Sequence, residues 1–244
     1  MSFDITNAFN KSNLDTYLKE LAKLFRKQNG KGATAEIVLV GGAAILVNYG
    51  FRDMTTDIDA LIYAPSSMKD AINQIGEQYH LPRGWLNADF MRTASYTNKL
   101  NEFSQYYKTF SGVLQVRSIS AEYLIAMKLK SGRKYKNDLS DIVGILAEHD
   151  KRGKPITLDR IELAVEHLYQ GWDGFSADAI AFIQNVIKAG NYMELMEQLE
   201  EQEKRSKDAI IGFQQKYPNT VTESNVDAIL EQLQSKNPKN TESR

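Results

Sequence analysis

The feature that most constrains the fold is the stretch VLVGGAAILVNYGFRDMTTDIDALIY, residues 38–63. An apolar, β-branched run leads into Gly41 and Gly42, a short apolar helical pattern follows, and Asp57 and Asp59 then open a second apolar run. Glycine has no Cβ, so the chain can turn sharply from a strand into a helix at this point. The stretch therefore predicts two strands, at residues 36–40 and 57–63, joined by a short helix at residues 43–49.

The two aspartates and the two glycines are complementary in chemistry. Side chains alternate along a strand, so Asp57 and Asp59 share one face about 7 Å apart. Two carboxylates at this spacing repel each other unless a cation lies between them, and hard oxygen ligands suit Mg²⁺ or Mn²⁺. The N–H groups of Gly41 and Gly42 at the start of a helix can face an anion. The layout predicts a nucleoside triphosphate held with a divalent ion, although a plain turn and a solvated strand end stay open as simpler interpretations.

The rest of the chain divides into a mixed part and a helical part. In the first part we expect helices over residues 13–29, 68–79 and 121–131 and a strand over 113–119. From Asp138 onward the pattern is helical, at residues 139–148, 158–169, 177–189, 192–217 and 226–234. This predicts an α+β fold, a small mixed sheet flanked by helices, followed by a C-terminal all-helical region. The expected domains are residues 1–140 and 141–235, with a disordered tail at 236–244.

Composition excludes several classes of protein. The chain has 244 residues, 42% of them hydrophobic and 25% charged, and a net charge of −1, as in ordinary globular proteins. It contains no cysteine, which excludes disulfides, thiolate zinc sites and a cysteine nucleophile. No apolar run approaches the roughly 20 residues of a membrane span, and the N-terminus lacks the pattern of a signal peptide. We therefore expect a cytoplasmic protein without membrane contact.

A basic segment lies where the two parts meet. Against one acid, Glu122, it holds six basic residues: Arg117, Lys128, Lys130, Arg133, Lys134 and Lys136. Such a segment suits a polyanionic ligand, and a solvated helix face is the alternative.

The motif residues resemble a known family. The string Gly41-Gly42-x-Ala44, followed by Thr56 and then Asp57-Ile58-Asp59, resembles the signature of the DNA polymerase β-like nucleotidyltransferase superfamily. Within it the chain is most similar to minimal bacterial domains related to the AbiEii toxin. Three strings support the narrower match: GWLN at 84–87, YLIAMKLKSGR at 123–133 and KNDLSDI at 136–142. The resemblance as a whole spans residues 14–190.

The resemblance implies transfer of a nucleotide from an NTP to an acceptor hydroxyl with release of pyrophosphate. It also assigns roles to individual residues. Asp57 and Asp59 would be catalytic and bind Mg²⁺ (or Mn²⁺), and Asp138, or Asp141 in its place, would complete the active site. The residues that would bind the nucleotide are Gly41, Gly42, Thr56, Lys128 and Arg133.

The chain departs from the family pattern on one strand. Many members carry a third carboxylate there, whereas residues 113–119 offer Gln115 and Arg117. Either Asp138 substitutes for that acid, or the activity is weak, altered or absent. Arg133 and Asp138 are also open to interpretation as a structural ion pair.

Other residues have simpler interpretations as well. Lys128 could be an ordinary surface lysine, and Asp141 is better explained as a charge at a helix N-terminus than as a metal ligand. Trp85 is expected in the core or in lid packing, with base stacking as the alternative.

The leading functional hypothesis is a metal-dependent nucleotidyltransferase acting on RNA, transfer RNA included, or on protein. It would be a toxin of a toxin–antitoxin or phage-defence system, with a cognate antitoxin as partner. The basic segment fits an RNA acceptor, because phosphate contacts supply most sequence-independent affinity. A non-catalytic nucleotide- or partner-binding module is the alternative, and modification of a small molecule is a third.

Overall fold

The computed structural model describes residues 8–133, 137–222 and 225–236. The chain forms two compact units. The first contains the chain through Lys130 together with Ile156–Gly174, and the second contains Ser131–Pro155 and the chain from Phe175 on. Lys134 and Lys136 of the basic segment, and residues 237–244 of the expected tail, lie outside the described residues. The expected domain boundary at residue 140 stays a prediction.

The elements confirm the predicted α+β class. In the first unit they are α1 (Lys11–Asn29), β1 (Ala35–Leu39), α2 (Gly41–Asn48), β2 (Ile58–Tyr63), α3 (Ser67–Gln78), β3 (Leu86–Asn87), the 3-10 helices η2 (Asp89–Arg92) and η3 (Asn98–Phe103), β4 (Ser104–Phe110), β5 (Leu114–Ile119), α4 (Ala121–Ser131, whose last residue falls in the second unit) and α6 (Leu158–Tyr169). In the second unit they are α5 (Asp138–Lys151), α7 (Ala177–Ala189), α8 (Tyr192–Lys216) and α9 (Val226–Lys236).

The five strands form one mixed sheet in the order β3-β2-β1-β5-β4. β1 is antiparallel to β2 and parallel to β5, β2 and β3 are parallel, and β4 and β5 are antiparallel. The short β3 and the polar edge strand β4 were not expected from the sequence. The sheet is therefore wider than the predicted strands alone would make it.

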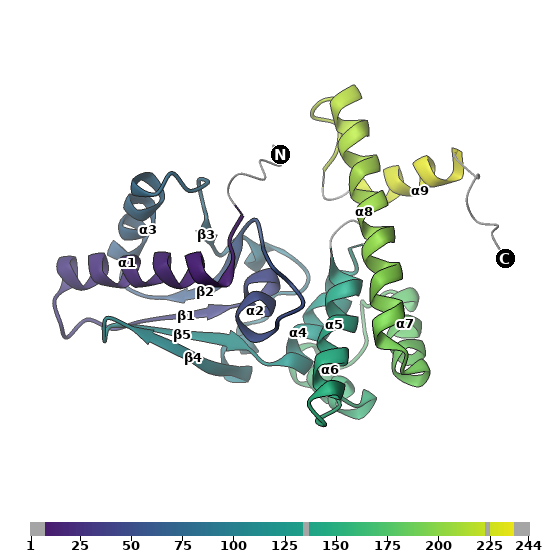
Figure 1. Ribbon diagram of the computed structural model, residues 1–244, viewed down its shortest axis with the longest axis horizontal. Helices are drawn as coiled ribbons and strands as arrows, with labels where there is room; N and C mark the ends of the chain where they lie inside the picture. Colours follow the sequence, from purple (N-terminus) through teal and green to yellow (C-terminus); the bar gives the residue numbers. More distant parts are fainter. Residues whose placement is uncertain (1–7, 134–136, 223–224, 237–244) are drawn as a thin grey trace. The chain divides into compact units, whose positions relative to one another are not determined.

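One face of the sheet packs against helices to form the core. Alternate strand residues such as Ile37, Ile58 and Val116 are fully buried there, together with Leu18 and Phe25 of α1. Figure 1 shows α1 and α3 beside each other over the sheet. The amphipathic period of α1 produces this burial, and a capping box between Asn10 and Asn13 fixes its start.

Trp85 belongs to this core. Its side chain is 1% exposed, its indole N–H donates to the carbonyl of Ile72 at 2.9 Å, and its ring stacks near Phe9. The core interpretation is confirmed, and a buried ring in this position does not stack on a bound base.

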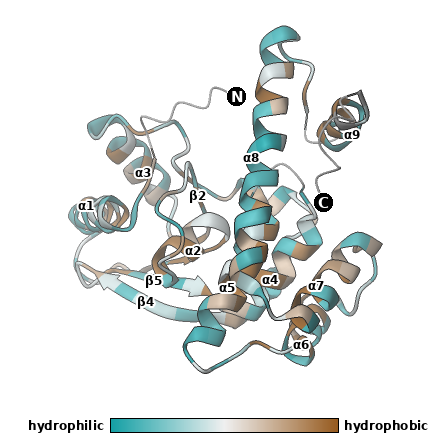
Figure 2. Cartoon of the chain, turned by 45° about the vertical axis from the view of Figure 1, so that its right-hand side comes forward, coloured by the Kyte–Doolittle hydropathy of each residue, from teal (hydrophilic) through white to brown (hydrophobic). Residues whose placement is uncertain are grey.

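The second unit is built on the packing of α5 along α8. Figure 2 shows α8 as largely hydrophilic, with short apolar stretches between the polar ones. Leu199 and Ile210 of α8 are buried, and Ile210 packs with Val226 and Leu230 of α9. Within the described ranges, every helix is too short or too polar to cross a lipid bilayer.

Candidate functional site

The candidate site lies at one edge of the sheet in the first unit. β1 and β5 are parallel, so their carboxyl ends meet at the same edge, where β1 leads into α2 and β5 into α4. β2 is antiparallel to β1 and therefore begins at that edge. Asp57 immediately precedes β2 and Asp59 is its second residue. Ligands of open α/β sheets bind outside such carboxyl ends of parallel strands.

Gly41 and Asp59 are brought together by the pairing of β1 with β2. The backbone N–H of Val40 donates to the carbonyl of Asp59 at 3.0 Å. A Cβ added to Gly41 would lie 3.4 Å from Asp59 Oδ2. Gly41 also has φ +56°, in the left-handed region that favours glycine. The residue at position 41 is thus constrained both by its backbone conformation and by a carboxylate next to it.

Gly42 allows the loop that carries Arg52 and Thr55 to approach α2 closely. A Cβ at this position would lie 2.6 Å from Thr55 Oγ1 and 3.3 Å from the guanidinium carbon of Arg52. Any side chain here would push that loop away from the first turn of α2. The structure begins α2 at Gly41, two residues earlier than the sequence predicts, so both glycines belong to that turn.

The loop before β2 is fixed by backbone pairing. Thr55 exchanges two backbone hydrogen bonds with Phe9, at 2.7 and 2.8 Å, and its hydroxyl donates to the carbonyl of Asp57 at 3.1 Å. Arg52 Nε donates to the carbonyl of Met54 at 3.1 Å. These contacts hold a cation beside the N-terminal turn of α2, where the helix dipole already favours an anion.

Sequence reasoning chose Thr56 and missed Thr55 and Arg52. Thr56 is exposed, whereas Thr55 is buried against Gly42. A signal was present, because Arg52 is the only basic residue between the glycines and the aspartates. The nucleotide-binding role of Thr56 stays a prediction.

The two aspartates differ in burial, Asp57 being exposed and Asp59 partly buried. The strand register puts Arg117 on the same face of the sheet as Asp59. Arg117 does not replace the third carboxylate of the family pattern. It donates to the hydroxyl of Ser104 at 2.7 Å and so ties β5 to β4.

Among the residues that the structure describes, no group of three His, Cys, Asp or Glu side chains is arranged to hold a metal ion. The metal-binding role of Asp57 and Asp59 stays a prediction.

Lys128 is not a surface lysine. It lies on α4 and is 6% exposed. A buried ammonium requires compensating contacts, which an ordinary surface position would not need. Its predicted role in binding phosphate is not decided by burial and stays a prediction.

Arg133 and Asp138 form an ion pair in the second unit, as the alternative interpretation of these two residues predicted. Arg133 Nε lies 2.9 Å from Asp138 Oδ2, and the Ser131 hydroxyl donates to the same oxygen at 2.7 Å. Asp138 is 2% exposed. The predicted roles of Asp138 in catalysis and of Arg133 in binding the nucleotide stay predictions.

A further buried carboxylate caps the helix that carries Asp138. Glu203 of α8 accepts from the backbone N–H groups of Leu139 and Ser140, at 3.0 and 3.2 Å, and from the Ser140 hydroxyl at 2.5 Å. Burial, aided by Asp141, raises the pKa of Glu203 from 4.5 to about 7, although these hydrogen bonds lower it. Asp141 lies in the first turn of α5, as expected of a charge at a helix N-terminus.

A comparison with family models adds an independent observation. The model described as "Nucleotidyltransferase of unknown function (DUF6036)" matches residues 13–148, more than half of the chain. The chain belongs to this nucleotidyltransferase family. No curated protein and no solved structure matches the chain. The matched range contains the positions of all the predicted site residues, whose individual roles stay predictions.

Proposed function

We propose that the protein is a metal-dependent nucleotidyltransferase that moves a nucleotide from an NTP to an acceptor hydroxyl. The observation that carries the proposal is the contact between Gly41 and Asp59. A glycine in a left-handed conformation opens a helix, and a carboxylate oxygen lies 3.4 Å from its Cβ position. The anion-binding end of a helix and a cation-binding side chain are therefore neighbours.

The triphosphate would lie at the first turn of α2. The first N–H groups of a helix have no intrahelical acceptor, so the amides of Gly41 and Gly42 suit phosphate oxygens. The Arg52 guanidinium lies beside this turn and adds a fixed positive charge. Arginine forms two parallel hydrogen bonds to phosphate, which makes it a stronger partner than a neutral donor.

The carboxylates fit a Mg²⁺ ion that arrives with the nucleotide. Asp57 and Asp59 supply hard oxygen ligands. Mg²⁺ is commonly held by one or two carboxylates together with substrate phosphates and waters, so two acids are enough for such an ion. When bound, the ion supplies a Lewis acid that polarises phosphoryl oxygens.

In the proposed transfer, the acceptor hydroxyl oxygen forms a bond to the α-phosphorus. The bond from that phosphorus to the bridging oxygen of the β-phosphate breaks, and pyrophosphate leaves. The hydroxyl proton passes to water, which reaches the exposed Asp57. The protein contributes mainly position and charge, as is general for phosphoryl and nucleotidyl transfer.

We further propose that the acceptor is RNA, with transfer RNA included, and that the protein is AbiEii-like and acts as a toxin with a cognate antitoxin. The basic residues of the sequence between Arg117 and Arg133 favour a polyanionic acceptor, although Arg117 already donates to Ser104 and Arg133 pairs with Asp138. A protein hydroxyl as acceptor is the outcome that the experiment must distinguish.

The decisive experiment incubates the full chain with Mg²⁺, each α-³²P-labelled NTP, and total cell RNA and protein. Wild type should label one pool, while Asp57→Asn and Asp59→Asn should lower the label at least a hundredfold. Asp70→Asn, which removes an exposed carboxylate of α3, is the matched control and should label as wild type does.

Metal binding is read separately, by electron paramagnetic resonance of Mn²⁺ with an unreactive NTP analogue. Binding without transfer in any condition would favour the non-catalytic module.

A further inference from the structure

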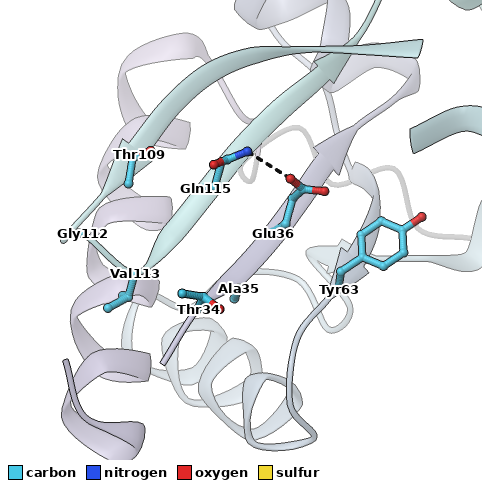
Figure 3. Close-up of a pocket in the computed structure, with 8 residues that line it drawn as sticks. All are labelled: Thr34, Ala35, Glu36, Tyr63, Thr109, Gly112, Val113 and Gln115. Carbon is cyan, nitrogen blue, oxygen red and sulfur yellow. Dashed lines mark hydrogen bonds between the residues drawn. The ribbon is translucent and has the colours of Figure 1, made fainter. Parts of the chain in front are cut away.

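A row of polar side chains crosses the sheet at the end away from Gly41. Tyr63 of β2 pairs with Glu36 of β1, Glu36 with Gln115 of β5, and Gln115 with Thr109 of β4. Paired residues share a face, so one side chain from each of four strands stands in the same line. They border a hollow of about 330 Å³ (Figure 3). This is the face that carries Asp59, opposite the one covered by α1 and α3.

The hollow is rich in hydrogen-bond acceptors. Gln115 Nε2 donates to Glu36 Oε2 at 3.0 Å, which orients both side chains (Figure 3). The carboxylate and the amide oxygen keep further capacity to accept, so the row suits a ligand that presents N–H groups. The negative charge of Glu36 would repel a phosphate. A neutral, hydrogen-bonding ring therefore fits the row better than an anion does.

Aromatic side chains stand around the same row. Tyr63 is 45% exposed and Tyr106 of β4 is 60% exposed. The Tyr106 hydroxyl donates to Thr109 Oγ1 at 3.2 Å, which places this tyrosine next to the row. Exposed aromatic rings on an open sheet face are a platform on which nucleobases stack.

We propose that this row binds a base of a single-stranded RNA acceptor, at a site separate from the glycine–aspartate site. The inference rests on the proposed function, because it names where that acceptor is held. A nucleobase combines the two features that the row can recognise, N–H groups on its edge and a flat aromatic face. The volume of the hollow is near the lower end for small-ligand sites, as a single base requires.

The distance to Asp59 suits this arrangement. Tyr63 and Asp59 are four residues apart on β2, or about 13 Å, a span of about four stacked nucleotides at roughly 3.4 Å each. Between them Leu61 and Val38 are buried, and η2 contacts β2. η2 carries the exposed Arg92, a cation for the phosphates that would pass here.

The test measures binding of a fluorescein-labelled, mixed-sequence eight-nucleotide single-stranded RNA to the full chain by fluorescence anisotropy. Base stacking on an aromatic residue is worth about 1–3 kcal/mol, so Tyr63→Ala should weaken binding about 5- to 160-fold. Tyr63→Phe keeps the ring and should bind nearly as wild type. Tyr217→Ala removes a tyrosine of equal exposure from the second unit and should change nothing.

A second variant guards against a folding artefact. Glu36→Gln keeps the size of the side chain but replaces the charged acceptor of the base N–H groups by a neutral one. A hydrogen bond to a charged group contributes about 1.5–3 kcal/mol, so this variant should weaken RNA binding about tenfold while leaving the melting temperature near that of wild type. Wild type that fails to bind this RNA, or Tyr63→Ala and Glu36→Gln variants that bind as wild type does, would overturn the inference. Label transferred to protein together with no RNA binding would overturn it as well.

Asp59→Asn separates this inference from the proposed function. If RNA binding depends on Tyr63 in both wild type and Asp59→Asn, and neither transfers a nucleotide, the row binds RNA and the proposed activity is wrong. If wild type labels RNA but Tyr63→Ala binds and labels it equally well, the activity stands and the inference about the row fails.

Discussion

Glycine is required at position 41 for two separate reasons, its backbone conformation and the nearby Asp59 carboxylate, and substitution should have a measurable effect through each. We expect Gly41→Ala to lower the free energy of unfolding by about 1–2 kcal/mol, because an L side chain is strained at φ +56°. The added Cβ would also lie 3.4 Å from Asp59 Oδ2 and disturb the carboxylate. Urea unfolding measures the first effect and calorimetry with an NTP the second.

Gly50 provides the matched control for this prediction. No atom lies within 4 Å of its Cβ position, and its φ is outside the left-handed region. Gly50→Ala should therefore be neutral or stabilise the protein by a few tenths of a kcal/mol. Equal stability losses for the two alanine variants would show that neither strain nor the Asp59 contact matters at position 41.

Arg52 gives the second prediction at this scale. Its guanidinium lies next to the first turn of α2, so under the proposed function it pairs with phosphate. Hydrogen bonds to charged groups contribute about 1.5–3 kcal/mol, and Arg52→Gln should weaken NTP binding at least tenfold in calorimetry. Arg83→Gln, which changes an exposed arginine of the same unit, should bind as wild type does. An unchanged affinity for Arg52→Gln would remove this residue from the site.

The contact of Gly41 with Asp59 was predictable because it follows from local rules. A glycine turn after one strand and an alternating Asp-x-Asp at the start of the next meet as soon as the two strands pair. The positions of Thr55 and Arg52 were not predictable in this way. They depend on the backbone pairing of Thr55 with Phe9, which is 46 residues away and carries no local signal.

At the scale of elements, strongly periodic segments were predicted well. The helices at 121–131, 158–169 and 177–189 match the structure, and the other predicted helices and strands differ by three residues or fewer at their ends. β4 was missed because SQYYKTF is an edge strand with polar residues on both faces. A bulge at Tyr106–Lys108 further breaks its alternation.

The capping of α5 was also beyond sequence reasoning, since its cap comes from another helix. Asn137 at the N-cap makes no side-chain cap bond, and Glu203 of α8 supplies the acceptors instead. Burying this carboxylate outweighs the hydrogen bonds that it receives, so its pKa is about 7 in the folded protein. The folded state therefore binds the Glu203 proton more tightly than the unfolded state does.

This linkage predicts how stability changes with pH. Between about pH 4.5 and 7 the folded state holds more protons on Glu203, so this group lowers the stability as pH rises through that window. We expect Glu203→Gln to flatten the dependence and to exceed wild type in unfolding free energy at pH 8 by on the order of 2 kcal/mol, with little difference at pH 4.5. Urea unfolding at a series of pH values measures the free energy of unfolding of wild type and of Glu203→Gln.

Glu201→Gln is the control for that series, because Glu201 lies on the same helix but is exposed, where it pairs with Arg205. It should follow the wild-type curve. A Glu203→Gln variant that is less stable than wild type at pH 8 would show that the attraction between the carboxylate and the N-terminus of α5 exceeds the cost of burial.

At the scale of the whole chain, the compact units do not follow sequence order. α6 belongs to the first unit although α5, which precedes it, belongs to the second. His167 of α6 stacks on Phe103 and lies 2.8 Å from the Tyr123 hydroxyl through its Nδ1. The Tyr169 hydroxyl donates to the carbonyl of Ser95 at 2.7 Å. The sequence pattern predicts the position of α6 along the chain but does not predict these long-range contacts.

These contacts decide how fragments of the chain should behave. A fragment of residues 1–140 lacks α6, so Phe103 and Tyr123 lose their contacts with His167, and the buried Ile161 and Val165 are no longer present to cover apolar surface. A fragment of residues 1–174 keeps them, and α8, on which α5 packs, is absent from both fragments. We expect the longer fragment to unfold cooperatively and the shorter one to melt at least 10 °C lower or to aggregate, since burial of one aliphatic side chain contributes about 1.5–3 kcal/mol. Calorimetry of both fragments beside the full chain measures this difference. Equal melting temperatures would mean that the first 140 residues fold as a domain without α6, as the sequence alone predicts.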